Sequence, residues 1–265
     1  MTESASRRPR LVLGDDGEQP SDVAWRWVTN QEWPGWYVDV LTADTGDTPI
    51  EWGKPPAHHE WTPPWARTQP VKGSIEVRFF RVGTDPRAML AELEDLDLVV
   101  LGLRTHGYLK ALVTGSTTEW MLHDPPAPLV VASSPETVHR VTVCADGSGH
   151  AARAIDAFTS LPFAAATTVT VLTIDDGRTD PHQGIESAVS HLEDKVAEIE
   201  TVTAEGAPTP TILAHLEEQM PDLVVLGTRG LTGWKRLRLG STAAAVVRSA
   251  PCSSLVASTD IADIG

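Results

Sequence analysis

Short apolar runs alternate with amphipathic stretches along most of this chain. Residues 141–144 and 223–226 are apolar runs typical of strands buried in a sheet, and residues 168–174 are rich in β-branched side chains. Between these runs, apolar residues recur at helical spacing, as they do at Ala151, Ala154, Ile155 and Phe158. Strands that alternate with helices predict an α/β fold with a parallel sheet covered on both faces.

An internal repeat relates the two halves of the chain. The agreement between the halves is dense and includes a stretch of identical residues, Leu-Val-Val-Leu-Gly, that occurs in both. This self-similarity predicts two tandem copies of one domain, at residues 9–134 and 138–259. The matching segments are 11–17 with 141–147, 98–102 with 223–227, and 131–133 with 256–258.

A glycine-rich segment follows the apolar run of the second copy and precedes a predicted helix. Its spacing is Gly227-x2-Gly230-x9-Gly240-Ser241. Ligands bind beyond the carboxyl ends of parallel strands, and glycines there let the backbone approach a ligand closely. A helix that begins at Ser241 points its unpaired N–H groups at the same place, which favours a phosphate chain as the ligand. The segment also contains a basic cluster, made of Arg229, Lys235, Arg236 and Arg238.

The matching segment of the first copy departs from this pattern. Gly102, Gly115 and Ser116 stand at the matching positions, but Thr105 replaces the second glycine. A β-branched residue tolerates positive φ poorly and places a Cβ where the phosphate would pass. We therefore expect a weakened or absent site in the first copy and a competent site in the second.

Residues 49–72 form an insert that is peculiar to the first copy. The insert contains six prolines and three tryptophans, a composition that is incompatible with the helix expected at the matching place in the second copy. We predict an irregular loop. Seven of the nine tryptophans lie between Trp25 and Trp65, and they either pack inside the domain or form an exposed patch that docks an unknown protein partner.

No metal site and no catalytic residue is predicted. His58 and His59 are adjacent, so their side chains point in different directions, and no third ligand stands at a helpful spacing. The Walker spacing with its Gly-Lys-Ser/Thr is absent, and no Ser-His-Asp arrangement appears in a supporting chain order.

The composition of the chain restricts the kinds of molecule that it can bind. The formal net charge is −15, which disfavours binding to nucleic acid or to anionic lipid. No apolar run approaches the length that crosses a bilayer, and the first ten residues lack the apolar core of a signal peptide, so we expect a cytoplasmic protein with no membrane partner. The two cysteines, Cys144 and Cys252, lie in or beside apolar runs and are interpreted as small core residues.

The Asp-Gly pairs that end the first strand of each copy, and the Gly-x2-Gly-x9-Gly-Ser spacing, resemble the universal stress protein family. The chain is most similar to the tandem two-domain members of its ATP-binding subgroup. The resemblance implies two Rossmann-like (adenine nucleotide alpha hydrolase-like) domains, each an open, five-stranded parallel sheet. It also implies adenine-nucleotide binding, with ATP as the ligand and Mg²⁺ as a potential companion.

The resemblance assigns roles to residues of the second copy. It places Ala145 and Asp146 near adenine and ribose, the backbone of Ile174 at the adenine, and Gly227 near the ribose. An aspartate suits the sugar hydroxyls, which donate hydrogen bonds, although Asp146 reads equally well as a turn residue. The candidates around the phosphates are Arg229, Gly230, Gly240, Ser241 and Thr242. The weaker candidates of the first copy are Asp16, Ala43, Gly102, Gly115, Ser116 and Thr117.

The favoured hypothesis is a cytoplasmic stress-response protein that binds ATP, mainly in its second copy, as a regulatory or assembly ligand. Two alternatives stay open: slow ATP hydrolysis or phosphoryl transfer, and a scaffold that binds no nucleotide. In two-domain family members the last strands of the two copies pair across a pseudo-twofold axis, which applies here to residues 129–133 and 255–258. A further homodimer is common in the family, but the residues do not decide it.

Overall fold

The computed structural model describes residues 7–15, 19–43, 59–60, 69–82, 93, 95–103, 121–122, 125–177, 180–228 and 240–257. The elements of the first half are β1 (Arg10–Asp15), α1 (Gln19–Asn30), β2 (Tyr37–Ala43), β3 (His59–Glu60), β4 (Glu76–Val82), β5 (Leu98–Gly102) and β6 (Leu129–Ala132). The elements of the second half are β7 (Arg140–Cys144), α4 (Gly149–Thr159), β8 (Thr168–Asp175), α5 (Pro181–Leu192), β9 (Glu198–Glu205), α6 (Pro208–Gln219), β10 (Leu223–Gly227), α7 (Ser241–Ser249) and β11 (Ser253–Ala257).

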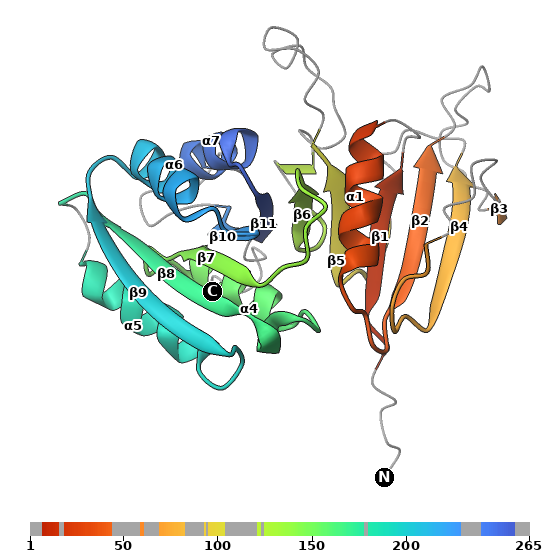
Figure 1. Cartoon of the computed structure of the whole chain (residues 1–265), viewed down its shortest axis with the longest axis horizontal. Coiled ribbons are helices and arrows are strands. Elements are labelled where there is room, and N and C mark those ends of the chain that lie inside the picture. Colours follow the sequence, from red (N-terminus) through yellow and green to blue (C-terminus); the bar gives the residue numbers. More distant parts are fainter. Residues whose placement is uncertain are drawn as a thin grey trace, which may run out of the picture.

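All of these strands join in one sheet of eleven strands, which runs across the whole molecule (Figure 1). The strand order is β3-β4-β2-β1-β5-β6-β11-β10-β7-β8-β9. The order β4-β2-β1-β5-β6 of the first half reappears in the second as β9-β8-β7-β10-β11, and every pair within these groups is parallel. The predicted α/β fold with an open, mostly parallel sheet is confirmed.

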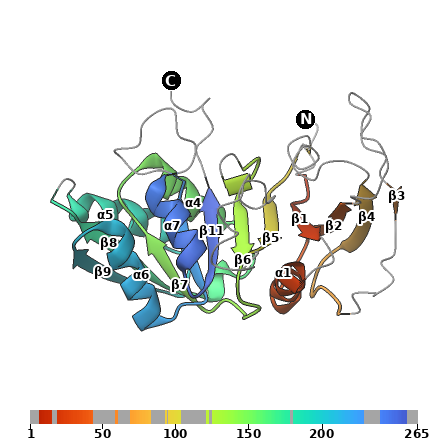
Figure 2. The same ribbon diagram turned by 90° about the horizontal axis from the view of Figure 1, so that it is seen from above.

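The two halves meet at the centre of the sheet, where β6 and β11 pair in antiparallel fashion (Figure 2). Leu255 lies opposite Val130, and Val256 lies opposite Leu129. The predicted pairing of the two last strands is therefore confirmed. Each of these strands would otherwise present an unpaired edge, and their union covers both edges at once.

The strand registers follow the internal repeat of the sequence. Leu11 lies opposite Leu98 on one side and Val38 on the other, in the same way as Val141 lies opposite Leu223 and Val169. Residues that match in sequence thus occupy matching positions in the sheet. This agreement allows each feature of one half to be compared with its counterpart in the other.

The strand side chains alternate between two apolar layers, and described helices pack into both of them. One layer contains the apolar sides of α1, α4 and α5, including Val28, Phe158 and Leu192. The other layer contains Leu216 of α6 and Val246 of α7. The apolar stripe predicted at Ala151, Ala154, Ile155 and Phe158 is buried in α4.

Four tryptophans of the first half are core residues, as one of the two interpretations predicted. Trp25, Trp27, Trp33 and Trp36 are all buried. Trp27 and Trp33 also pack edge-on against Phe163 of the second half, with ring centroids 6.0 and 5.9 Å apart, so they help to join the halves.

The insert at 49–72 lies largely outside the described residues, including its tryptophans Trp52, Trp61 and Trp65. Residues 59–60 are described and form β3, which pairs in antiparallel fashion with the edge strand β4. The prediction of a wholly irregular insert was wrong at this point. An edge strand offers unpaired backbone groups, and a short piece of the insert pairs with them.

Both cysteines pack against the apolar layer that contains α6 and α7. They are free thiols, and burial raises the pKa of Cys144 and of Cys252 to about 12. A thiol with such a pKa stays protonated and unreactive at neutral pH. The interpretation of these cysteines as small core residues is confirmed.

Neither a metal-binding cluster nor a membrane-spanning helix occurs among the described residues. No group of three or more His, Cys, Asp or Glu side chains in that part of the chain is placed to hold a metal ion. None of the described helices is both long and apolar enough to span a bilayer.

Candidate functional site

The adjacent strands β7 and β10 end side by side in the second half of the sheet. The helix that follows β7, α4, packs in one apolar layer, and the helix that follows β10, α7, packs in the other. The chain therefore leaves these two strands toward opposite faces. Such a point in an open α/β sheet creates a crevice at the carboxyl ends of the strands, and ligands of this fold class bind there.

The turn from β7 to α4 is built from residues 145–148. Ala145 is buried, and its N–H donates to the carbonyl oxygen of Leu172 in β8 (2.9 Å). Asp146 is half-buried, and its Oδ1 accepts a hydrogen bond from the N–H of Ser148 (3.0 Å). Gly147 has φ = +75°, a conformation that favours glycine. Asp146 thus fills the turn role that was one of its two interpretations.

The start of α7 lies directly at the end of β10. Thr228 follows β10 and is fully buried, and its N–H donates to the carbonyl oxygen of Ala257 in β11 (3.0 Å). Its own carbonyl oxygen accepts a hydrogen bond from the N–H of Gly240 (2.6 Å). Thr228 and Gly240 are therefore held next to each other at the end of β10. This hydrogen bond brings the N-terminus of α7 to the β7–β10 crevice.

The first turn of α7 presents donors without a side-chain acceptor. Gly240 is its N-cap residue, in an extended conformation, and no described side chain caps the helix. By contrast, the Ser148 side chain caps α4 and the Asp180 side chain caps α5. Ser241 is exposed at this end. An uncapped N-terminus, with the positive end of the helix dipole, is suited to bind an anion.

Comparison with known families bears on the same half of the chain. Residues 137–258 match the model of the universal stress protein family. This segment is a universal stress protein family domain. The crevice between β7 and β10 lies wholly within it, and we refer to residues 137–258 as the Usp domain.

Individual proteins are also similar to this chain. The universal stress protein YxiE of Bacillus subtilis is 35% identical over 27% of this chain and 49% of its own length, so the chain spans about half the length of this curated relative. A solved universal stress protein from Archaeoglobus fulgidus covers 96% of this chain and 97% of its own, with 19% identity and a TM-score of 0.65, which shows a shared fold. A universal stress protein solved in complex with cAMP is 26% identical and covers 47% of this chain and 100% of its own, with a TM-score of 0.40.

Gly227 ends β10 inside the Usp domain and has a packing reason to be glycine. A Cβ at this position would lie 2.7 Å from the backbone nitrogen of Ala151 and 2.7 Å from the carbonyl carbon of His150. The first turn of α4 therefore passes directly over Gly227. This contact fixes α4, and with it the turn that carries Asp146, against the end of β10.

One glycine of the Usp domain site escaped prediction from the sequence. Gly184 lies within α5, and a Cβ there would lie 3.2 Å from the carbonyl oxygen of Ala145 and 3.4 Å from the nitrogen of Gly147. The available signal was a glycine inside a helix, where it costs about 1 kcal/mol relative to alanine and usually serves close packing.

The predicted site residues that the structure describes gather at one edge of the Usp domain. Ala145 and Asp146 follow β7, Ile174 is the second-last residue of β8, and Gly227 ends β10. Gly240, Ser241 and Thr242 begin α7. The remaining candidates of the Usp domain, Arg229 and Gly230, lie outside the described residues.

The corresponding edge of the first half is described only in part. Ala43 ends β2 and Gly102 ends β5, as predicted from the repeat. Outside the described residues lie Asp16, Thr105, Gly115, Ser116 and Thr117. Asp15, which sequence reasoning passed over, ends β1 at the position of Ala145 and is buried. The first half thus places a carboxylate where the Usp domain has a methyl group.

Proposed function

We propose that the Usp domain binds ATP in the crevice between β7 and β10, as a regulatory or assembly ligand in a cytoplasmic stress response. The observation that carries this proposal is the hydrogen bond between Gly240 and Thr228, because it sets the uncapped N-terminus of α7 at the switch point of the sheet. The glycine spacing around that bond and the family of the domain both support a nucleotide rather than another anion.

The polarity of the crevice orients the nucleotide. Asp146 lies on the β7 side, where its carboxylate is suited to ribose hydroxyls and would repel phosphate. The N–H groups and hydroxyls of Ser241 and Thr242 lie on the α7 side and are suited to the phosphates. We assign adenine to the β8 side of the crevice, beside buried Ala145 and within hydrogen-bonding reach of the Ile174 backbone.

We further propose that the chain is a tandem pair of one domain, at 9–134 and 138–259, with a competent site in the second copy and a weakened or absent site in the first. The repeated strand order and the matching registers support the tandem arrangement. Thr105 in the loop sequence and buried Asp15 at the end of β1 support a weakened first site. A carboxylate at that position repels the phosphates of a nucleotide, unless it accepts hydrogen bonds from the ribose hydroxyls.

Calorimetric titration of nucleotide-free protein with ATP tests the proposed function. We expect one site per chain and weak or no binding of UTP, because the proposed site is assigned to adenine. Phosphate release measured on the same samples separates binding from hydrolysis, and we expect none above the rate in buffer. If the folded protein bound no ATP, the proposal would be wrong, and the alternative of a scaffold that binds no nucleotide would be favoured. Sustained phosphate release would favour the alternative in which the protein hydrolyses ATP, and would contradict a purely regulatory role of the nucleotide.

A further inference from the structure

A cavity of about 450 Å³ lies in the first half of the chain, away from the crevice of the Usp domain. Four arginines line it together with an apolar wall that includes Leu41, Phe80 and Leu93. These apolar residues belong to the layer opposite the one that contains α1. Arg10 and Tyr37 are the first residues of β1 and β2, so part of the cavity lies at the amino ends of these strands. The four arginines are Arg7, Arg8, Arg10 and Arg78, and we call this space the arginine cavity.

A buried aspartate holds two of the arginines in place. Asp39 of β2 is 0% exposed and accepts hydrogen bonds from Nε of Arg10 (2.6 Å) and from Nε and Nη2 of Arg78 (2.7 and 3.0 Å). The hydrogen bond with Asp39 raises the pKa of the Arg78 guanidinium above its ordinary value. Arg78 also stacks over the ring of Tyr37, with its guanidinium carbon 5.3 Å from the ring centroid. Both guanidinium groups are therefore fixed before any ligand arrives.

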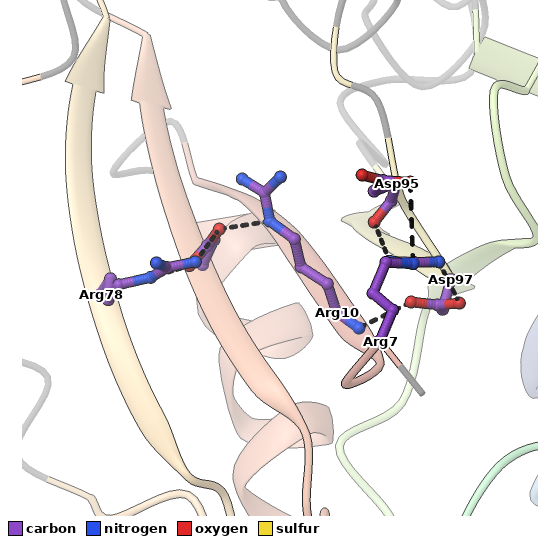
Figure 3. A network of polar contacts seen from close by, with 6 residues as sticks. Arg7, Arg10, Arg78, Asp95 and Asp97 are labelled. Carbon is purple, nitrogen blue, oxygen red and sulfur yellow. Dashed lines mark hydrogen bonds and ion pairs between the residues drawn. The ribbon is translucent and has the colours of Figure 1, made fainter. Parts of the chain in front are cut away.

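The same pairing leaves donors of Arg10 unused. Only its Nε is engaged by Asp39, and within the described part of the chain its two terminal nitrogens make no hydrogen bond. Figure 3 shows these nitrogens pointing away from the carboxylate. A guanidinium anchored through Nε presents its two remaining NH₂ groups as a fork, the geometry that matches phosphate or carboxylate.

Arg8 lines the cavity without an acidic partner among the described residues. Arg7 is engaged by Asp97 (2.9 Å) and by Asp95 (3.7 Å), while Arg8 has no acidic or hydrogen-bonding partner in the described part of the chain. Arg78 is paired with Asp39 and also interacts electrostatically with Glu76. The described residues thus leave the guanidinium of Arg8 unpaired, in a chain whose net charge is −15.

The second half shows that the fold does not need this cluster. Arg140 stands at the position of Arg10, but its guanidinium donates to the backbone carbonyls of Gln219 and Met220 at the end of α6. The register positions of Asp39 and Arg78 are occupied there by Thr170 and Glu200. The Arg–Asp–Arg arrangement is therefore particular to the first half.

We propose that the arginine cavity binds a small organic phosphate, with its phosphate on Arg8 and Arg10 and its apolar body against Leu41, Phe80 and Leu93. The volume lies in the range of small-molecule sites, roughly 300–1,000 Å³, and the combination of an apolar wall with a few convergent charged donors is typical of them. The unpaired guanidinium of Arg8 and the free fork of Arg10 favour a phosphate dianion over a monocarboxylate. This site is independent of the proposed function of the Usp domain.

Titration of the full chain with phenyl phosphate tests the proposal, with inorganic phosphate and benzoate as comparison probes. We expect one site for phenyl phosphate per chain, tighter than for either comparison probe. Arg8→Gln and Arg10→Gln should each weaken binding by about tenfold or more, the usual loss for a charge-assisted hydrogen bond. Arg8 is exposed and unpartnered in the described structure, so Arg8→Gln remains folded even if Arg10→Gln destabilises the Asp39 cluster.

Arg140→Gln is the matched control, because it removes the arginine at the same register position of the second half. Phenyl phosphate should bind this variant as it binds the wild type, and it should also bind Ser241→Glu, which alters only the Usp domain crevice. The proposal is overturned by absence of phenyl phosphate binding, by equal binding of Arg8→Gln and wild type, or by inorganic phosphate or benzoate binding as tightly as phenyl phosphate. Loss of binding in Ser241→Glu would assign the probe to the nucleotide crevice instead.

Discussion

Replacement of Ser241 by glutamate is expected to weaken ATP binding by about 100-fold or more, while the protein stays as stable as the wild type. Ser241 is exposed in the first turn of α7, so the longer side chain has room. A carboxylate there interacts favourably with the helix dipole, by about 0.3–1 kcal/mol. It also places a negative charge where the phosphates would bind. Two like charges about 4 Å apart near a protein surface repel by roughly 4 kcal/mol, more than the 100-fold loss requires.

Ser116→Glu is the control for this prediction, because Ser116 matches Ser241 in the internal repeat. If the second copy holds the functional site, ATP should bind Ser116→Glu as it binds the wild type. Calorimetry gives the affinities and thermal unfolding gives the stabilities. An affinity of Ser241→Glu within a few-fold of wild type would show that the phosphates do not lie at the start of α7.

The second large effect is expected from Gly227→Ala, which should destabilise the Usp domain and weaken ATP binding together. The new methyl group would lie 2.7 Å from backbone atoms of His150 and Ala151, which are not flexible ends of side chains. Overpacking of this kind costs about 1–3 kcal/mol. The unfolding midpoint should fall by about 2–10 °C. Displacement of α4 also moves the turn that carries Asp146, so the affinity for ATP should fall as well.

Gly177→Ala separates this steric effect from general backbone strain. Gly177 has φ = +73° and no atom within 4 Å of its Cβ position, so its replacement adds strain without a clash. It should lower stability by about 1 kcal/mol and leave the ATP affinity unchanged. Wild-type stability of Gly227→Ala would contradict the close contact between α4 and β10.

Much of this fold was predictable because the decisive signals are local. The apolar run at 223–226 became β10, and the helical spacing around Ile155 became the buried side of α4. The internal repeat then predicted the order of elements in each half, and the resemblance to two-domain family members predicted the pairing of β6 with β11. Periodicity and self-similarity are properties of the sequence itself, so they can be recognised without three-dimensional information.

The features that were not predicted depend on contacts between distant segments. Gly184 approaches Ala145 only because α5 crosses the end of β7, and no local pattern around Gly184 reports that approach. The pairing of Asp39 with Arg10 and Arg78 joins three strands that are adjacent in space and far apart in sequence. The hydrogen bond from Gly240 to Thr228 likewise joins two residues that are separated in the sequence, and no local pattern indicates that they pair.

The ratio of nucleotide to protein tests the central claim most directly. The chain is incubated with excess ATP, freed of unbound nucleotide by gel filtration and denatured, and the released nucleotide is identified and counted by chromatography. The proposed function predicts one ATP per chain, held by the Usp domain. Two ATP per chain would contradict the asymmetry between the halves, and none would contradict nucleotide binding altogether.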